Sequence, residues 1–193
     1  TKGSIQDCNT QYAQGGIAAA VGPGDSPSNH LDDTLAAGAG LCNRDAARLL
    51  AENGPQAIAE LVRLGVTFDT TNGEIALGRE AAHGIPRVLH AGGDATGAQI
   101  ELTLASLARS SRIDVREYLT TTRLLLTDDR SCVVGVAGFD SRTGTESKYF
   151  GKNTILATGG SGQLYRYTTN PGVTTGDGVS LAYNAGAAIM DME

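Results

Sequence analysis

The chain has 193 residues, of which 40% are hydrophobic and 19% charged, and its formal net charge at pH 7 is −6. This composition is ordinary for a globular protein, and the length suffices for one domain with a sizeable core. The sequence has no cluster of lysine and arginine and no run of about 18 apolar residues, which argues against a nucleic-acid partner and a membrane-spanning segment.

The glycine and cysteine residues indicate the class of protein and its cellular compartment. The 26 glycines exceed the usual share of about 7%, and glycine lets the backbone approach a ligand closely, which favours a nucleotide-binding α/β protein. The three cysteines form no C-x-x-C pair. This spacing argues for a reducing compartment and against structural zinc, so we expect a cytoplasmic protein.

In the first half of the chain, capping residues and glycines divide the sequence into short helices. The predicted elements are a Gly-rich loop over 1–27, a helix from Asn29 to Gly38, helices over 44–53 and 55–64 separated by Gly54, a strand over 66–68, and a helix over 96–110. The stretch 69–95 is long and irregular, which is often the mark of a functional segment.

The second half is rich in strand-like runs. They are predicted over 113–118, 121–127, 132–139, 146–150, 153–157 as a buried parallel strand, and 187–191, with a helix over 177–186 capped by Thr175 or Asp177. Helices mixed with these strands indicate an α/β fold with a small antiparallel β insertion over about 113–150.

Three small-residue turns are candidate ligand contacts. Thr158–Gly162 could bring backbone amides to a phosphate or a ring edge, and Ala13–Gly16 is a similar turn. Thr174–Gly178 is a polar turn that can cap a helix. None completes G-x-G-x-x-G, so each alone is equally consistent with a tight turn or a helix cap. The histidines and carboxylates over 79–97 lack ligand spacing on one element, so no metal site is expected.

Together, the order and spacing of these blocks resemble the family of succinate dehydrogenase, fumarate reductase and aspartate oxidase flavoproteins. Asn9–Ala19 is similar to their flavin-contacting loop, Leu156–Gly160 to their second FAD motif, and 168–178 to the segment that follows. The resemblance implies an FAD/NAD(P)-binding, Rossmann-like domain over residues 1–193, truncated at both ends. The first strand-turn-helix would precede residue 1, and a capping domain with the catalytic arginine and histidines would follow residue 193.

The resemblance also implies which residues bind FAD. They are Lys2, Asn9, Thr10, Gln11, Tyr12, Ala13, Gln14, Gly15, Gly16, Thr158, Gly159, Gly160 and Asp177. Asn9 stands where respiratory members of the family carry the histidine that bonds covalently to FAD. Asparagine cannot form that bond, so we expect non-covalent FAD.

The blocks 33–42 and 87–97 are similar to the aspartate oxidase branch. That branch oxidises L-aspartate to iminoaspartate with O2 or fumarate as the electron acceptor, and the product enters the quinolinate synthase pathway to NAD. Two alternatives stay open: a soluble fumarate reductase or succinate dehydrogenase type of flavoprotein, and a non-catalytic flavin-binding domain.

Glu80 is the one substrate-side residue that the resemblance implies. It matches the acidic residue of a Thr-Arg-Glu-Gly-Gly-His block that orients the substrate ammonium group, a charge-assisted contact that succinate cannot make. This chain has Gly78 in place of the threonine and Ala81-Ala82 in place of the two glycines. Glu80 is also consistent with an ordinary solvated carboxylate.

Overall fold

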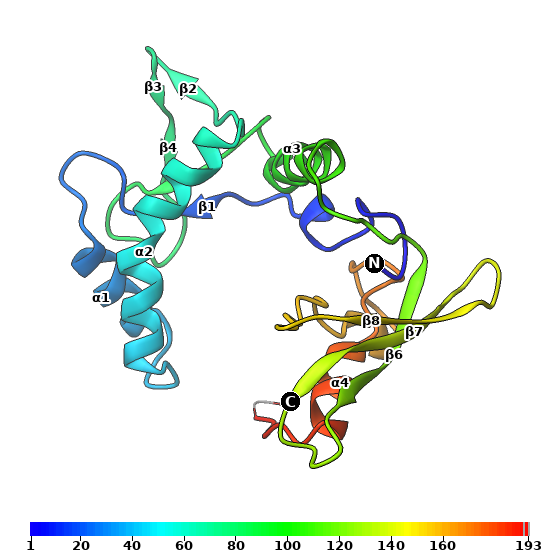
Figure 1. The fold of residues 1–193 in the computed structure, drawn as a ribbon. Coiled ribbons are helices and arrows are strands. Elements are labelled where there is room, and N and C mark those ends of the chain that lie inside the picture. Colours follow the sequence, from blue (N-terminus) through cyan, green and yellow to red (C-terminus); the bar gives the residue numbers. More distant parts are fainter. Residues whose placement is uncertain (191, 193) are drawn as a thin grey trace. The chain divides into compact units, whose positions relative to one another are not determined.

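The computed structural model describes residues 1–190 and 192 (Figure 1). The chain forms two compact units: Thr10–Leu107, called the helical unit here, and Thr1–Asn9 with Ala108–Glu193, called the sheet unit. Helices and strands are mixed, as expected for the α/β class, and every strand pair of the described residues is antiparallel. None of the helices in this described part is long and apolar enough to span a membrane.

The helical unit contains most of the helices and several very short strands. In chain order its elements are η1 Thr10–Tyr12, β1 Ile17–Ala18, α1 Pro27–Ala37, α2 Arg44–Arg63, β2 Thr70–Thr71, β3 Glu74–Ile75, β4 Leu77–Gly78, β5 Val88–Leu89 and α3 Thr96–Ser110, which extends past the boundary at Leu107. The predicted start of α1 at Asn29 is wrong. The Ser26 side chain caps the helix by accepting a hydrogen bond from the Asn29 N–H at 3.1 Å, so α1 begins at Pro27.

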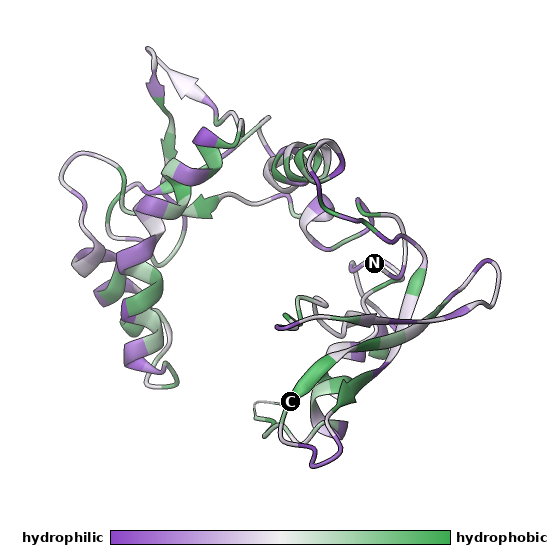
Figure 2. Ribbon diagram, in the orientation of Figure 1, coloured by the Kyte–Doolittle hydropathy of each residue, from purple (hydrophilic) through white to green (hydrophobic). Residues whose placement is uncertain are grey.

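Helix α2 is continuous where two helices were expected. Asn43 caps it as predicted, but the helix passes through Gly54 and Pro55 without ending. Ala51 and Ile58 lie seven residues apart on one face, and both are buried. Burial of this face outweighs the hydrogen bond that Pro55 removes from the helix. Figure 2 shows hydrophilic and hydrophobic residues alternating along α2.

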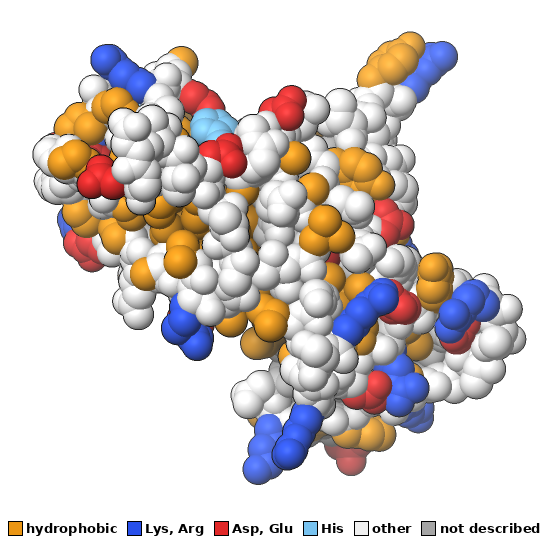
Figure 3. Space-filling view, turned by 90° about the horizontal axis from the view of Figure 1, so that it is seen from above, with side chains coloured by type: hydrophobic (Ala, Val, Ile, Leu, Met, Phe, Trp, Pro, Cys, Tyr) orange, Lys and Arg blue, Asp and Glu red, His pale blue; other side chains and the backbone are white. Residues whose placement is uncertain are grey.

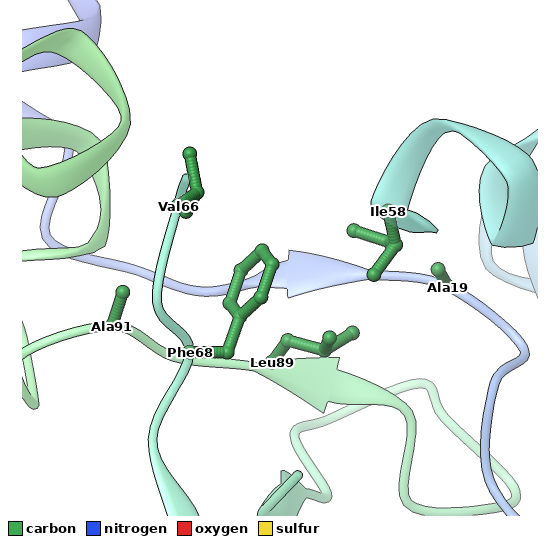
Figure 4. Close-up of a cluster of buried hydrophobic side chains, with 6 residues drawn as sticks. All are labelled: Ala19, Ile58, Val66, Phe68, Leu89 and Ala91. Carbon is green, nitrogen blue, oxygen red and sulfur yellow. The ribbon is translucent and has the colours of Figure 1, made fainter. Parts of the chain in front are cut away.

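The core of the helical unit lies on a three-stranded sheet with the order β1-β5-β4. Its buried apolar residues are Ala19, Ile58, Val66, Phe68, Leu89 and Ala91. Figure 4 shows Phe68 and Leu89 beside each other, with Ile58 reaching from α2 toward Ala19. The strand expected over 66–68 is wrong. Val66 and Phe68 are buried in the core, but their backbone does not pair with a neighbouring strand.

The sheet unit is built on an antiparallel meander of β6 Leu119–Leu126, β7 Val133–Asp140 and β8 Glu146–Phe150. This confirms the predicted insertion, except that 113–118 is not a strand; Tyr118 has φ 60°, which interrupts an extended backbone just before β6. The short helix η2 Gly162–Leu164 follows, and α4 Asp177–Asn184 packs beside β6 (Figure 1). Figure 3 shows acidic and basic side chains interspersed on the face that it presents.

Two further predicted strands are wrong in the described residues. The apolar run 153–157 is neither paired nor buried, and Ile155 is 88% exposed. A strand needs a hydrogen-bonded neighbour, and the described part of the chain supplies none for this run. Residues 187–190 are likewise unpaired, and residue 191 lies outside the described residues. The expected side-chain cap of α4 is also absent: Gly176, with φ 74°, is its N-cap.

Candidate functional site

The predicted flavin-side loop of the helical unit lies against the first turn of α3. Thr10–Tyr12 form one turn of 3-10 helix, and the Gly97 N–H donates a hydrogen bond to the Ala13 carbonyl oxygen at 3.0 Å. A Cβ atom at Gly97 would overlap the Thr10 carbonyl oxygen. The close approach of loop and helix therefore requires glycine at position 97, which the sequence did not single out. Residues 12–15 remain exposed, so a ligand can reach them.

Two adjacent glycines of this loop have different surroundings. A Cβ at Gly16 would overlap Val88 and the Leu89 carbonyl oxygen and would lie 2.9 Å from His90 Nε2. A Cβ at Gly15 would meet no atom within 4 Å. Packing inside the protein therefore explains Gly16, whereas the backbone at Gly15 is open to an incoming group.

In the sheet unit, Lys2 and Asp177 form an ion pair with 2.7 Å between Nζ and Oδ2. Lys2 also donates to the Thr175 hydroxyl, and Thr175 Oγ1 donates to Asp177 Oδ1 at 2.8 Å. The hydrogen bond from Lys2 lowers the pKa of Asp177 below its ordinary value, with a smaller contribution from Thr175. Asp177 is therefore an oriented carboxylate that can accept further hydrogen bonds from ligand hydroxyl groups.

Two more predicted residues meet the same segment. The buried Thr174 donates from Oγ1 to Asn9 Oδ1 at 3.1 Å, which fixes the amide of Asn9. Thr158 lies so close to Gly178 that a Cβ there would overlap the Thr158 hydroxyl, and the Gly176 N–H donates to the Gly160 carbonyl oxygen at 3.1 Å.

The structure thus gathers the predicted residues of the sheet unit, namely Lys2, Asn9, the turn 158–160 and Asp177, around residues 174–178. The turn 158–160 is exposed, and a Cβ at Gly160 would find only one methyl group, at 3.8 Å. Exposed amides, open glycine backbone and a carboxylate fit a nucleotide cofactor that carries both phosphates and hydroxyl groups.

Glu80 lies in the loop between β4 and β5, and its side chain is 57% exposed. Its Oε1 is 3.4 Å from Nε2 of His90, the residue that directly follows β5. Ala82, in the same loop, has φ 71°, a left-handed conformation that favours glycine. The position where this chain departs from the Gly-Gly of the family block is therefore a strained one.

The same loop is anchored by a charged network that the sequence did not reveal. Arg87, which ends the loop, is completely buried and pairs with Asp25 and Asp33. Asp33 Oδ2 accepts from Arg87 Nη1 and from the Gly84 N–H, both at 2.6 Å. Asp33 is 54 positions from Arg87 and 51 positions from Gly84 in the chain, so only the fold brings these residues together. Within the described residues, no group of three or more histidines, cysteines or carboxylates could hold a metal ion.

Curated relatives align with the whole chain. It is 46% identical over 198 residues to an L-aspartate oxidase of Streptomyces coelicolor and 43% identical over 194 residues to one of Synechocystis. A chloroplastic L-aspartate oxidase of Arabidopsis thaliana is 39% identical over 197 residues. The chain spans only about a third of the length of these relatives, 34% of the first two and 30% of the third.

Solved structures agree with this similarity. Mycobacterium smegmatis Sdh1 in complex with UQ1 matches with a TM-score of 0.89 and 35% identity, over 97% of this chain and 34% of that one. A quinol-fumarate reductase with menaquinol molecules matches with a TM-score of 0.87 and 30% identity, over 96% of this chain and 32% of that one. The family described as the FAD binding domain matches residues 1–193. The chain therefore belongs to the FAD binding domain family.

Proposed function

We propose that this chain forms the FAD-binding part of a cytoplasmic flavoenzyme that oxidises L-aspartate to iminoaspartate. O2 or fumarate would accept the electrons, and the product would serve quinolinate and NAD biosynthesis. The observation that carries the proposal is the similarity along the whole chain to L-aspartate oxidases, which reaches 46% identity.

The cofactor proposal rests on the two groups of residues described above. In the helical unit, the exposed loop 12–15 offers backbone amides, and in the sheet unit the turn 158–160 and Asp177 offer amides and a carboxylate. Bound FAD would supply the redox chemistry by accepting a hydride from the substrate. Asn9, whose amide is held by Thr174, offers no nucleophile for a covalent bond to flavin. Denaturation of the purified holoprotein should therefore release the yellow flavin into the supernatant, and a protein pellet that retains it would contradict non-covalent binding.

Substrate choice would depend on Glu80. Its exposed carboxylate can accept a hydrogen bond from the ammonium group of L-aspartate, an interaction that a plain dicarboxylate cannot make. If Glu80 were only a solvated surface carboxylate, its removal would change nothing in catalysis.

A direct test compares L-aspartate with succinate as reductant of the full-length holoprotein. We expect L-aspartate to bleach the flavin absorbance without oxygen and to generate peroxide with oxygen, and we expect succinate to do neither efficiently. A Glu80→Gln variant should raise KM for L-aspartate. The absence of flavin reduction by L-aspartate would overturn the proposed activity.

The structural similarity to quinol-fumarate reductase supports a second candidate, a fumarate reductase or succinate dehydrogenase activity. Rapid reduction by succinate with no response to L-aspartate would favour it. A non-catalytic flavin-binding role predicts flavin content without reduction by either compound. Gly15→Val tests flavin binding itself, because a side chain at that position meets no protein atom.

A further inference from the structure

We propose that His90 is a positioning residue that holds the Glu80 carboxylate in place for the substrate ammonium group. The inference deepens the proposed oxidation of L-aspartate and rests on it. The observation behind it is the 3.4 Å approach of His90 Nε2 to Glu80 Oε1, together with the way in which the imidazole ring is confined.

The backbone of His90 is fixed by the core of the helical unit. His90 directly follows β5, the central strand of the β1-β5-β4 sheet, and the preceding Leu89 is completely buried. The His90 carbonyl oxygen accepts a hydrogen bond from the Asp69 N–H at 2.8 Å. A side chain on such a rigid element has a well-defined origin, which a loop residue lacks.

The imidazole ring is confined between two glycines. A Cβ at Gly16 would lie 2.9 Å from His90 Nε2, and a Cβ at Gly78 would lie 3.3 Å from His90 Cε1. A residue larger than glycine at position 16 or 78 would therefore restrict the space that the His90 ring occupies. Its Nε2 atom lies against the loop expected to contact flavin and close to Glu80, and the side chain is 30% exposed, so the site stays open to a small substrate.

Glu80 has much less support of its own. Its side chain is 57% exposed. The hydrogen bonds within this loop, from the Arg79 side chain (Nε) to the His83 carbonyl oxygen and from the His83 N–H to the Glu80 carbonyl oxygen, do not involve the Glu80 carboxylate. A hydrogen bond from His90 Nε2–H to Oε1 would select one rotamer and leave Oε2 to accept from the ammonium group. Such pre-organisation improves binding because less rotamer freedom is lost when the ligand arrives.

The test uses the full-length holoprotein and the variants His90→Phe and His90→Gln. Phenylalanine keeps a ring but has no donor, so we expect KM for L-aspartate to rise about tenfold, which corresponds to about 1.4 kcal/mol, while kcat changes by less than about twofold. Glutamine restores a donor, so His90→Gln should recover most of the loss. In a Glu80→Gln background, His90→Phe should have no further effect, because the group that His90 orients is gone.

Succinate provides the internal control, because it lacks the ammonium group. Its dissociation constant, measured from the perturbation of the flavin spectrum, should be the same in wild-type protein and both His90 variants. If the His90 variants bound succinate and L-aspartate equally more weakly than wild type, His90 would have a general structural role, and the inference would be overturned. So would an unchanged KM in His90→Phe when Glu80→Gln raises it.

Glu74→Gln is the matched control for Glu80→Gln, because Glu74 is an exposed carboxylate of the β2–β3 hairpin in the same unit. It should leave both ligands unaffected. If wild-type protein shows no reduction by L-aspartate at all, the proposed function fails and this inference fails with it. If L-aspartate reduces the wild-type protein and the His90 variants have the same KM as wild type, the inference alone fails.

Discussion

The guanidinium group of Arg87 donates two hydrogen bonds to the carboxylate of Asp25, with Nε 2.8 Å from Oδ2 and Nη2 2.9 Å from Oδ1, and both side chains are completely buried. The two residues are 62 positions apart. Their pairing connects the segment before α1 to the end of the loop that carries Glu80. A buried guanidinium without its counter-charge is strongly unfavourable, so the pair must form for this loop to reach its place.

Asp25→Asn should therefore be severely destabilising. The variant keeps the shape of the side chain but leaves Arg87 buried with less compensation, and we expect the free energy of unfolding to fall by about 3 kcal/mol. Urea denaturation of wild-type and variant protein measures the difference. Asp45→Asn is the control, because Asp45 pairs with Arg48 on the surface of α2 with 88% of its side chain exposed, and such a pair contributes less than about 1 kcal/mol. Similar losses in the two variants would contradict this reading of the buried pair.

The buried His30 should make stability fall in mild acid. Burial lowers the pKa of His30 below its ordinary value of 6.5, the charges of Arg87 and His83 lower it further, and Asp25 and Asp33 oppose these effects. Its Nδ1 atom is buried without a hydrogen-bond partner. The unfolded chain therefore takes up the proton more readily than the folded chain, and the free energy of unfolding decreases as the pH falls below about 6.5.

Urea denaturation between about pH 7.5 and pH 5.5 measures this effect, and His30→Gln should flatten the dependence, because glutamine does not titrate. An identical pH dependence in wild-type and variant protein would show that His30 is not its source. The carboxylates that the fold stabilises titrate at lower pH, since the Arg87 hydrogen bond lowers the pKa of Asp25 from 3.8, so their contribution is lost only below about pH 4.

Ala82→Gly should stabilise the protein. Alanine in the left-handed region is unfavourable by roughly 1–2 kcal/mol, and glycine removes this strain although it makes the unfolded chain more flexible. With φ 71° at Ala82, we expect a net gain of about 0.5 kcal/mol or more in the free energy of unfolding. Ala81→Gly is the matched control: Ala81 is not among the residues with positive φ, so the same substitution should be neutral or destabilising there. A gain at position 81 equal to that at position 82 would contradict the strain argument.

Three glycine variants separate packing from ligand contact. Gly97→Ala and Gly178→Ala should destabilise the protein even without flavin, because the added Cβ atoms would overlap the Thr10 carbonyl oxygen and the Thr158 hydroxyl. Gly15→Ala should leave the stability of the flavin-free protein within about 0.5 kcal/mol of wild type, because the added atom meets nothing within 4 Å. If the loop contacts flavin, Gly15→Ala should still lower the flavin-to-protein ratio. Full flavin retention in Gly15→Ala would argue against a close contact at that position.

The features that the sequence predicted well are those with local causes. Asn43 caps α2 through its own neighbours Asp45 and Ala46, and Gly38 ends α1 where the pattern places it. The meander β6-β7-β8 follows from alternating residues and short turns, so its position is readable without knowledge of the rest of the fold.

The failures have non-local causes. Gly54 and Pro55 are local helix breakers, but Ala51 and Ile58 make the buried face continuous across them. The run 153–157 has the composition of a buried strand, yet no strand among the described residues pairs with it. At the candidate site, family resemblance pointed to Lys2 and Asp177, but their ion pair across 175 positions could be found only from the structure.

The loop that carries Glu80 is anchored by backbone hydrogen bonds at Arg87 and Gly84. The Arg87 N–H donates to the Gly78 carbonyl oxygen at 3.1 Å, and the Gly84 N–H donates to Asp33. Arg87 forms a buried ion pair with Asp25, so the amide hydrogen of Arg87 should exchange with solvent only in rare, large-scale openings of the helical unit. Residues 79–83 make contacts nearer the surface, such as the hydrogen bond from Arg79 Nε to the His83 carbonyl oxygen at 3.0 Å. Their amide hydrogens should therefore exchange faster than that of Arg87.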